Sequence, residues 1–260
     1  MDPLVRLERV AMAYGRGAAA ARVIEDVSLE IAHGEFIAVV GPSGCGKSSL
    51  MKLVSGLHPP LAGTLTLEGR PVTGPIKSVG MAFQHSNLLP WRNALDNVLL
   101  PLEIVEPFRR DFKKDRKKHA QRAKELLEHV GLAGFTQKFP WELSGGMQQR
   151  ASICRALIHE PEILMLDEPF AALDAFTREE LWCALRDLQA ERKVTVMLVT
   201  HDLREAVFLA DTVYVMSDRP GRILRRCEVK IARPRDLDVT YTQAFQDLVH
   251  ELRTLIGIKH

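Results

Sequence analysis

A glycine-rich segment of the chain has the spacing G-x-x-x-x-G-K-[ST] and reads Gly41-Pro42-Ser43-Gly44-Cys45-Gly46-Lys47-Ser48. It stands between an apolar run, Phe36–Val40, and a helical pattern that begins at Lys47, which is the context that a phosphate-binding loop requires. In such a loop the backbone N–H groups converge on a phosphate, the lysine ammonium reaches the β- and γ-phosphate oxygens, and the hydroxyl of Ser48 is offered to Mg²⁺. The segment predicts nucleotide binding; a glycine-rich turn with a chance lysine is the less favoured alternative.

Two carboxylates follow another apolar run. Ile163–Leu166 predicts a buried strand, and Asp167 and Glu168 come directly after it. Ligands bind at the carboxyl ends of strands in open α/β sheets, so Asp167 is placed to hold Mg²⁺ through water and Glu168 to polarise an attacking water. Alone, this pair would more often be a polar strand end. Together with the phosphate-binding loop it predicts a catalytic site.

A second glycine pair opens another predicted helix, in Leu143-Ser144-Gly145-Gly146-Met147-Gln148-Gln149-Arg150. Helix N-termini attract anions through free backbone N–H groups and the helix dipole. The chain therefore offers two phosphate-facing surfaces. The simpler interpretation is a helix cap in which Ser144 bonds its own first turn, and both interpretations can hold together because a capped N-terminus still directs amides outward.

The elements around these segments alternate between strand and helix. Strands are predicted at Phe36–Val40, Ile163–Leu166, Val194–Thr200 and Thr212–Met216, and helices at Lys47–Gly56, Gly145–His159, Ala175–Glu191 and Leu203–Ala210. This βαβ alternation favours a parallel sheet covered by helices. Two earlier strands, Val5–Met12 and Val23–Ile31, flank a predicted loop at 13–22 that holds the short alanine-rich stretch Ala18–Ala21.

The middle of the chain has no strand pattern. From Asn93 to Gly134 it predicts a helix, a charged stretch, and a helix at Ala120–Val130 that ends at Gly131. The charged stretch, 109–118, is dense in Lys and Arg; a solvated helix face is favoured there over a lipid- or partner-binding patch. Further on, the patterns predict a turn at 218–221, a strand at Arg222–Ile231 and an amphipathic helix at Thr242–Ile256.

Composition limits the class of protein. The 260 residues are 46% apolar and 26% charged, with a formal net charge of +2 that gives no indication of a nucleic-acid partner. No apolar run approaches the roughly 18 residues of a membrane span, and the N-terminus lacks a signal-peptide pattern. The four cysteines, Cys45, Cys154, Cys183 and Cys227, form no C-x-x-C pair, so we expect neither zinc nor disulfides, and a soluble chain in a reducing cytosol.

Over nearly its whole length, the chain resembles the nucleotide-binding domain of ABC transporters, on the phosphate-binding loop, the Leu143–Arg150 signature and the acidic strand end. The resemblance implies an α/β fold: a P-loop NTPase core, with a parallel sheet flanked by helices, an N-terminal antiparallel β subdomain and an inserted α-helical subdomain. It further implies a single domain over 1–260. Residues 1–90 and 160–231 would form the core with its β subdomain, about 91–159 the helical subdomain, and 232–260 a C-terminal helical tail.

The resemblance also implies roles for residues outside the motifs. Tyr14 stands where the family places an aromatic that stacks on adenine, although its ring could merely pack in a loop. Gln84 stands where a glutamine links the γ-phosphate and metal to the permease, and His201 where a histidine contacts the γ-phosphate; a solvated cap residue is the simpler account of His201. Asp174 matches the loop that crosses between subunits.

The expected site residues divide into those for catalysis, for Mg²⁺ binding and for contacts with ATP. Catalysis is assigned to Glu168, His201, Lys47 and Gln84, and Mg²⁺ binding to Ser48, Gln84 and Asp167. Contacts with ATP are assigned to Tyr14, Gly41, Pro42, Ser43, Gly44, Cys45, Gly46, Lys47, Ser48, Ser49, Gln84, Asp167, Glu168, His201 and, across a dimer, Ser144, Gly145, Gly146 and Asp174. In this family the signature faces the ATP held by the opposite subunit, so we expect a homodimer that sandwiches two ATP molecules and hydrolyses them by in-line transfer to water.

Two further stretches resemble importer ATPases of the nitrate, aliphatic sulfonate and taurine group: Asn87–Asn93, which includes Trp91, and Ser217–Ile223. The first lies where such proteins receive a helix of the permease, and an exposed Trp91 beside Leu88 and Leu89 would suit that contact. The expected partners are permease subunits and, indirectly, an external substrate-binding protein. The expected location is the cytoplasmic face of the inner membrane, with no added regulatory domain, and the solute stays open.

The sequence leaves two alternatives to an importer ATPase. A soluble ABC ATPase of DNA repair, translation or iron–sulfur assembly is the alternative, and the presence of one signature and no heptad run counts against it. A nucleotide-binding module without turnover is weaker, because Glu168 and His201 would both be superfluous. Cys45 carries a local hypothesis: amides of the loop could lower the pKa of its thiol, although a passive small side chain is the favoured account.

Overall fold

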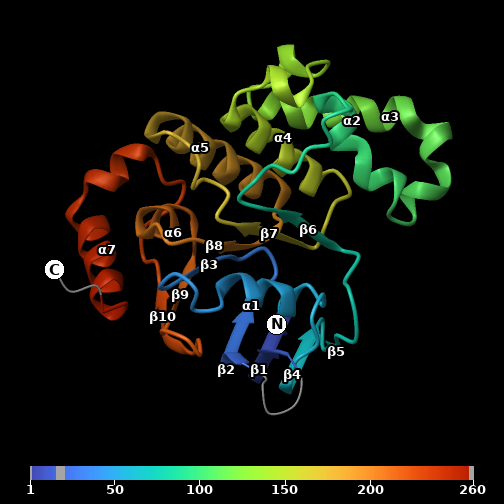
Figure 1. Ribbon diagram of the computed structural model, residues 1–260. Helices are drawn as coiled ribbons and strands as arrows, with labels where there is room; N and C mark the ends of the chain where they lie inside the picture. Colours follow the sequence, from blue (N-terminus) through green and yellow to red (C-terminus); the bar gives the residue numbers. More distant parts are fainter. Residues whose placement is uncertain (1, 16–20, 258–260) are drawn as a thin grey trace. The chain divides into compact units, whose positions relative to one another are not determined.

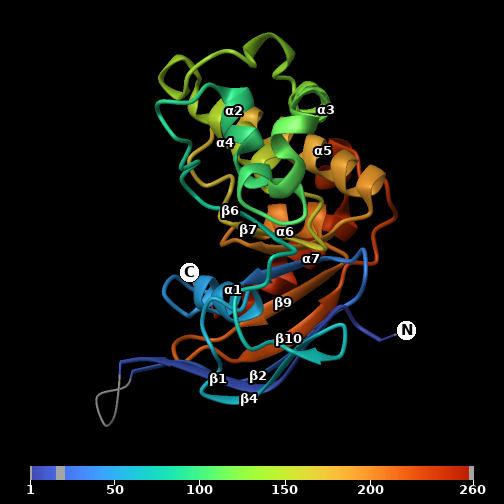
Figure 2. The same ribbon diagram turned by 90° about the vertical axis from the view of Figure 1, so that its right-hand side faces the viewer.

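A computed structural model describes residues 2–15 and 21–257 of the chain. The chain forms two compact units, Met1–Ile76 with Val194–His260, and Lys77–Lys193, and each is described by itself. Figures 1 and 2 show the elements of both, coloured along the sequence. Among the described residues, no helix combines the length and the apolar character that crossing a bilayer requires.

The first unit contains an antiparallel sheet. Its strands are β1 (Val5–Tyr14), β2 (Ala21–Ile31), β4 (Ala62–Leu67) and β5 (Arg70–Pro71), in the order β2-β1-β4-β5 (Figure 1). The two predicted strands are present and both are longer than expected, because β1 and β2 continue their pairing up to Tyr14 and Ala21. The loop between them is therefore shorter than 13–22, and most of the alanine-rich stretch lies outside the described residues.

The same unit contains a buried parallel core. The strands β3 (Phe36–Val40), β8 (Thr195–Val199) and β9 (Thr212–Met216) are buried at every position, and β3 pairs in parallel with both β8 and β9. The edge strand β10 (Ile223–Glu228) is antiparallel to β9 and shorter than predicted. Helix α1 (Lys47–Val54) contacts β8, and α6 (Leu203–Leu209) contacts β3. This arrangement confirms the α/β class, since strands that are apolar on both faces need cover on both.

The C-terminal residues are tied to this unit by a buried arginine. Arg235 is 2% exposed, and its guanidinium donates to the carbonyls of Val207, Phe208 and Ala210 at 3.0, 3.1 and 2.7 Å. The last carbonyls of a helix lack partners within it, so Arg235 satisfies the end of α6. Burial lowers the pKa of Arg235 to about 10, which leaves it charged at neutral pH. The final helix, α7 (Gln243–Leu255), follows and packs against α6.

The second unit is mainly helical. Its strands β6 (Val79–Ala82) and β7 (Ile163–Asp167) pair in parallel, and the fully described stretch 83–162 between them contains no strand. The helices are α2 (Ala94–Leu99), α3 (Phe108–His129), α4 (Gly145–Leu157) and α5 (Ala175–Arg192), with short 3₁₀ turns at Leu100–Glu103, Ala133–Phe135 and Pro140–Glu142. The prediction of a helical middle region is therefore confirmed in its type.

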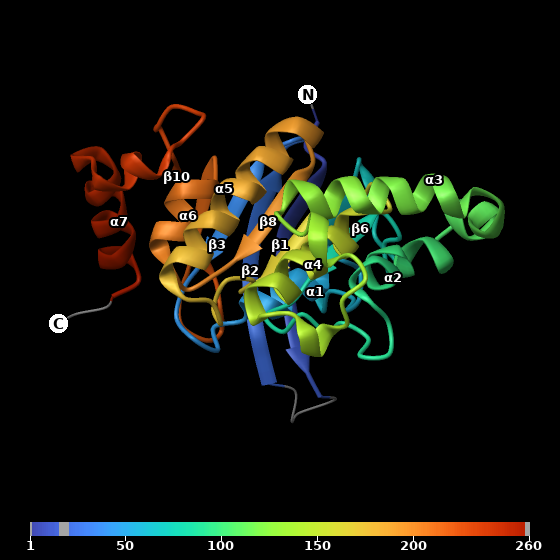
Figure 3. The same ribbon diagram turned by 90° about the horizontal axis from the view of Figure 1, so that it is seen from above.

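The boundaries of one helix were predicted wrongly. The favoured interpretation of the charged stretch 109–118 as a solvated helix face is confirmed, but the predicted helix start at Ala120 is wrong, because α3 runs without interruption from Phe108 to His129 (Figure 3). Lys and Arg have high intrinsic helix propensity, and no Gly or Pro occurs between these two ends. The absence of apolar periodicity in the stretch reflects missing burial, not missing helix.

Candidate nucleotide-binding site

The phosphate-binding loop joins β3 to α1 in the first unit. Gly44 and Gly46 have φ angles of +75° and +111°, a backbone region that favours glycine. The ammonium of Lys47 donates to the carbonyls of Gly41 and Pro42, each at 2.9 Å, and the residue is 6% exposed. The loop thus curves around a buried cation whose present partners are neutral carbonyls, which phosphate oxygens would replace with stronger, charge-assisted bonds.

The turn 218–221 packs closely against the phosphate-binding loop. The N–H of Gly221 donates to the carbonyl of Val23 at 2.8 Å, and the N–H of Glu25 donates to the carbonyl of Gly221 at 3.0 Å. A Cβ placed on Gly221 would lie 2.2 Å from the carbonyl oxygen of Cys45, inside the phosphate-binding loop. Sequence resemblance identified this turn without a physical role; the structure gives it one, as a close backbone support of the loop.

Cys45 does not carry the reactive thiol that the local hypothesis required. Its residue is 1% exposed, and burial raises the pKa of the thiol above its ordinary value, outweighing the opposite effect of nearby Lys47. A buried, protonated thiol is a poor nucleophile. The hypothesis of a lowered pKa is therefore wrong, because burial raises the pKa of the thiol by more than Lys47 and the backbone amides of Cys45 and Lys47 lower it.

Tyr14 lies at the end of β1 and is 39% exposed. Its hydroxyl is 3.3 Å from that of Ser49 on α1, and the ammonium of Lys52 donates to it at 3.4 Å. His58 contacts the ring edge-on, with centroids 5.4 Å apart. These contacts fix the ring beside the first turns of α1 and leave part of it open, which is compatible with stacking on a base. The alternative of a ring packed within a loop does not describe its surroundings.

His201 and the phosphate-binding loop line one cavity of about 700 Å³ in the first unit. Because β3 and β8 are parallel neighbours, the segments that follow them leave the sheet at the same edge. The cavity is lined by Gly41, Pro42, Ser43, His201, Asp202, Leu203, Arg204, Asp218, Val249, Arg253, Ile256 and Gly257. Four of these residues belong to α7 and the two positions after it, a contribution that nothing in the sequence pattern announced.

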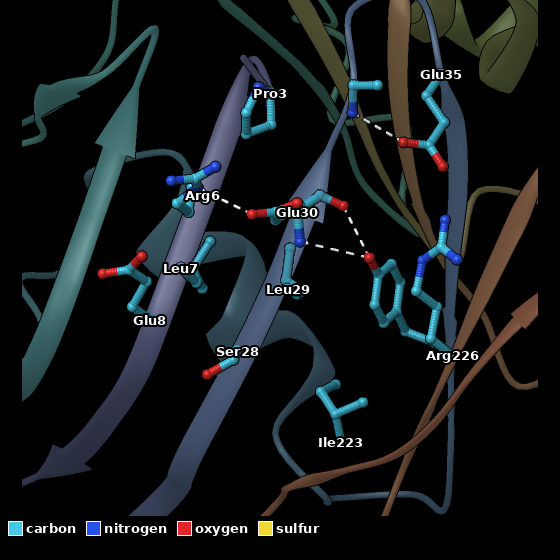
Figure 4. A pocket seen from close by; sticks show the side chains of 12 residues that line it. Pro3, Arg6, Leu7, Glu8, Ser28, Leu29, Glu30, Glu35, Ile223 and Arg226 are labelled. Atoms are coloured by element: carbon cyan, nitrogen blue, oxygen red, sulfur yellow. Dashed lines mark hydrogen bonds and ion pairs between the residues drawn. The ribbon is translucent and has the colours of Figure 1, made fainter. Parts of the chain in front are cut away.

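A second cavity in this unit, of about 500 Å³, contains none of the predicted site residues (Figure 4). Arg6 and Glu30 form an ion pair across it at 2.9 Å, and the hydroxyl of Tyr214 donates to the carbonyl of Glu30 at 2.8 Å. Glu35 accepts from the hydroxyl of Thr212 at 2.6 Å. These charged and polar groups already form hydrogen bonds or ion pairs with protein partners. The cavity is therefore explained as a polar space between strands.

The acidic strand end lies in the second unit. Asp167 is the last residue of β7, and Glu168 after it has a φ of 46°, which is unusual for a residue other than glycine. In the β6–β7 pair, Ala82 lies opposite Leu166, so Gln84 leaves the sheet at the same edge as the two carboxylates. The structure thus brings Gln84, Asp167 and Glu168 to one edge.

The two signature glycines have different surroundings. Ser144 caps α4 by accepting from the N–H of Met147 at 3.2 Å. A Cβ on Gly145 would meet nothing within 4 Å, whereas one on Gly146 would lie 2.5 Å from Cγ2 of Thr177 on α5. Gly145 is therefore open to an approaching group, and Gly146 permits close packing of α4 on α5.

Asp174 stands at the other side of this packing. It caps α5 by accepting from the N–H of Thr177 at 3.0 Å, and this bond lowers the pKa of Asp174 below its ordinary value. Thr177 thus donates to Asp174 and also fills the space beside Gly146, where a Cβ would clash with it. The signature helix and the Asp174 loop are consequently held together within the second unit.

Side chains of α4 also hold the loop that carries Gln84. Gln149 donates to the carbonyl of Phe83 at 2.8 Å, and Arg155 donates to the carbonyls of Ser86 and Asn87 at 2.7 and 2.8 Å. Gln148 accepts from the hydroxyl of Ser86 at 3.1 Å. The signature helix and the Gln84 loop are thereby tied by hydrogen bonds on both sides of Gln84.

The predicted site residues therefore fall into two groups. Tyr14, the phosphate-binding loop and His201 lie in the first unit, and Gln84, Asp167, Glu168, Asp174 and the signature lie in the second. In the described part of the chain, no group of three or more His, Cys, Asp or Glu side chains could hold a metal by itself. This fits Mg²⁺, which is usually bound by one or two protein oxygens together with water and substrate phosphates. Ser48, Gln84 and Asp167 can supply such oxygens.

Comparisons with known proteins agree with this geometry. Residues 24–171 match the family described as ABC transporter. The chain is 44% identical over 223 residues to the aliphatic sulfonates import ATP-binding protein SsuB of Bacillus licheniformis, covering 86% of this chain and 84% of that protein. It is 43% identical over 210 residues to the taurine import ATP-binding protein TauB of Yersinia pestis bv. Antiqua, covering 81% and 80%.

A solved structure has the same fold. A dimeric ATP-binding cassette in a post-hydrolysis state, bound to ADP and Pi, is 31% identical, with a TM-score of 0.72, and the match covers 88% of this chain and all of that chain. The family match spans more than half of the residues, and the relatives match over more than four fifths. The chain therefore belongs to the ABC transporter family of ATPases.

Proposed function

We propose that the protein is the ATP-hydrolysing subunit of a bacterial importer for a small anionic solute, with organic sulfonates as the leading class. The observation that carries this proposal is its likeness to SsuB and TauB over more than four fifths of the chain, since both names describe import of sulfonated compounds. The alternative, a soluble ABC ATPase of DNA repair, translation or iron–sulfur assembly, has no comparable support. The solute among nitrate, sulfonates and taurine is left to experiment.

The residues of the site suit in-line transfer of the γ-phosphoryl group to water. Lys47 neutralises charge on the β- and γ-phosphate oxygens, and His201 contacts the γ-phosphate from the cavity that it lines together with Gly41, Pro42 and Ser43. Glu168 orients and deprotonates the attacking water. Ser48, Gln84 and Asp167 would hold Mg²⁺, which would supply positive charge against the phosphate oxygens.

We further propose that the site is completed by a second copy of the chain. Ser144 and the amides of Gly145 and Gly146 would face the γ-phosphate bound by the other copy. The open space at Gly145 supports this, because a phosphate can approach the start of α4 without meeting a side chain. The solved cassette described above is itself dimeric. ATP would join two copies, and hydrolysis would release them.

The permease is the other proposed partner, with the protein at the cytoplasmic face of the membrane and a substrate-binding protein outside. Trp91 is 71% exposed, as a contact residue should be and a core tryptophan is not. Leu88 is buried at 9% exposure, so it supports the loop and does not take part in a surface contact. Gln84, itself exposed, lies seven residues before Trp91 on the same loop.

The test compares Glu168→Gln with Glu128→Gln, which makes the same change at an exposed position of α3. We expect Glu168→Gln to bind ATP, to accumulate as a dimer in size-exclusion chromatography and to lose hydrolysis by a hundredfold or more, on the order expected for removal of a general base. Glu128→Gln should behave as the unchanged protein. Hydrolysis by Glu168→Gln at the normal rate would refute the assignment of the base, and recovery with ribosomes or DNA in place of a permease would refute the importer.

A further inference from the structure

The positive charge of the chain is concentrated in residues 109–118, here called the basic segment. It holds seven of the 35 Lys and Arg residues and two aspartates, which gives it a net charge of +5. Since the whole chain carries +2, the other 250 residues together carry −3. All seven cationic side chains of the basic segment are exposed. A strongly basic surface is thus confined to less than three turns of one helix.

The cations of the basic segment are largely unpaired. Arg116 contacts a carboxylate oxygen of Asp96 at 3.1 Å. The other six have no ion-pair partner within the part of the chain that the structure describes. Asp111 and Asp115 on the same helix are too few to neutralise them. The charge is therefore available to a partner.

Packing does not explain the basic segment. The buried residues of α3 are His119, Ala123, Leu126 and Leu127, all of which come after it. Figure 3 shows the first turns of α3 extending beyond the part of the helix that lies along α4. The rings of Phe108 and Phe112 contact His119 of the same helix, with centroids 6.0 Å apart in each case. The first half of α3 thus contributes no fully buried side chain, although Phe108 and Phe112 lie half-buried against His119.

The basic segment also opposes its own helix. Cations near a helix N-terminus are disfavoured by the helix dipole, and Arg109 and Arg110 occupy the first turn. Like charges four residues apart repel, and the segment contains four such pairs, among them Arg110 with Lys114 and Lys114 with Lys118. A local conflict of this kind, without a compensating contact, is expected where a sequence serves function.

Exposed apolar side chains lie close to this helix. Arg92 and Glu103 form two hydrogen bonds, at 2.7 and 3.0 Å, which connect the chain after Trp91 to the chain before Ile104. Trp91 is 71% exposed and Ile104 is 62% exposed, and Ile104 lies four residues before α3. Trp91 is the proposed permease contact, so Ile104 is the exposed apolar side chain that remains beside the basic segment, and a cationic helix next to such a side chain suits a membrane interface.

We propose that the basic segment binds the headgroups of anionic phospholipids. The proposal rests on the proposed importer function, which places the unit beside a permease and therefore beside the membrane. A nucleic acid is the less suitable anion, because the rest of the chain carries net negative charge and because Ile104 would gain little from a phosphate backbone. Each Lys or Arg held near an anionic leaflet adds to the attraction.

The test measures co-sedimentation of the full-length protein with vesicles of phosphatidylcholine alone or mixed with phosphatidylglycerol. The variant replaces Lys113, Lys114, Lys117 and Lys118 by Gln. The matched control makes the same change of charge at four exposed cations outside the basic segment, namely Arg70, Lys124, Lys193 and Lys230. Neither set belongs to the nucleotide site, so both variants should hydrolyse ATP in solution as the unchanged protein does.

We expect the protein to bind vesicles that contain phosphatidylglycerol, with an affinity that falls steeply as the salt concentration rises. The affinity should fall by on the order of a hundredfold in the variant and only slightly in the control. Helix content by circular dichroism should be kept or increased in the variant, since repulsion is removed. Equal binding of the variant and the control, or equal binding to neutral vesicles, would overturn the proposal. Preference for an RNA or DNA oligonucleotide over phosphatidylglycerol vesicles would overturn it too, in favour of a nucleic-acid surface. The assay needs neither ATP nor permease, so its failure leaves the importer proposal standing.

Discussion

Replacing Gly221 by alanine tests whether the turn 218–221 fixes the phosphate-binding loop. The added Cβ would lie 2.2 Å from the carbonyl oxygen of Cys45 and 2.6 Å from Cε of Met216, where ordinary contacts begin near 3.4 Å. The end of the methionine side chain can move away. The carbonyl oxygen can yield about 1 Å only if the backbone of the loop moves, since Gly221 is clamped to β2 by two backbone hydrogen bonds.

The expected size of the effect follows from this overlap. Overpacking of a tight site costs about 1–3 kcal/mol. If the shift of the loop is felt at the phosphate, about 1.4 kcal/mol corresponds to a tenfold loss of affinity. Gly221→Ala should therefore weaken ATP binding by roughly 5-fold to 150-fold, while the protein still folds, because Gly221 has no left-handed φ that alanine would be unable to adopt.

The assay is calorimetric titration with ATP, together with thermal unfolding in the absence of nucleotide. Gly134→Ala is the control, since a Cβ there would meet nothing within 4 Å and its φ is also ordinary. We expect the control to keep full affinity. A fall in unfolding temperature with unchanged ATP affinity, or an equal loss of affinity in the control, would show that the turn does not position the loop.

Three further predictions concern other residues. Ser144→Arg should leave ATP binding nearly intact yet abolish dimer closure and hydrolysis, measured by calorimetry, size-exclusion chromatography and phosphate release; an equal loss of affinity would assign the signature to the nucleotide of its own chain. Burial lowers the pKa of His159 below its ordinary 6.5, so the unfolded chain binds more protons than the folded chain in acid, and the free energy of unfolding should fall as pH drops below that value. His159→Gln should reduce the difference between the free energies of unfolding that urea denaturation gives at about pH 7.5 and about pH 5.5. An equal difference in both proteins would contradict this. A thiol reagent should modify half-buried Cys183 before buried Cys45, as mass spectrometry of peptides would show, and faster labelling of Cys45 would mean that its burial is not maintained in solution.

Much of this protein was determined by local sequence. The order of apolar runs and helical patterns predicted the α/β class, because strands buried on both faces must be apolar at every position, as β3, β8 and β9 are. The phosphate-binding loop was predictable for a similar reason: its glycines and lysine act within eight consecutive residues, so no distant contact is needed to define them. The family resemblance rested on these short segments and is confirmed.

Local sequence failed where burial alone decides the outcome. The start of α3 was missed because apolar periodicity marks helices with a buried face, and the fully buried residues of α3 all lie at 119 or beyond. The thiol of Cys45 was open to two interpretations because its pKa depends on which way the side chain points. Burial against the protein interior, not the composition of the loop, raises that pKa.

Only the tertiary structure distinguished residues that look alike in the sequence. Gly145 and Gly146 are adjacent and identical, yet one faces open space and the other faces Thr177, because successive positions on a helix point in directions about 100° apart. Gly221 is 176 positions from Cys45 and supports it through a backbone contact that leaves no trace in local pattern. Sequence determined which groups can do chemistry; packing between distant segments decided which of them are held, buried or open.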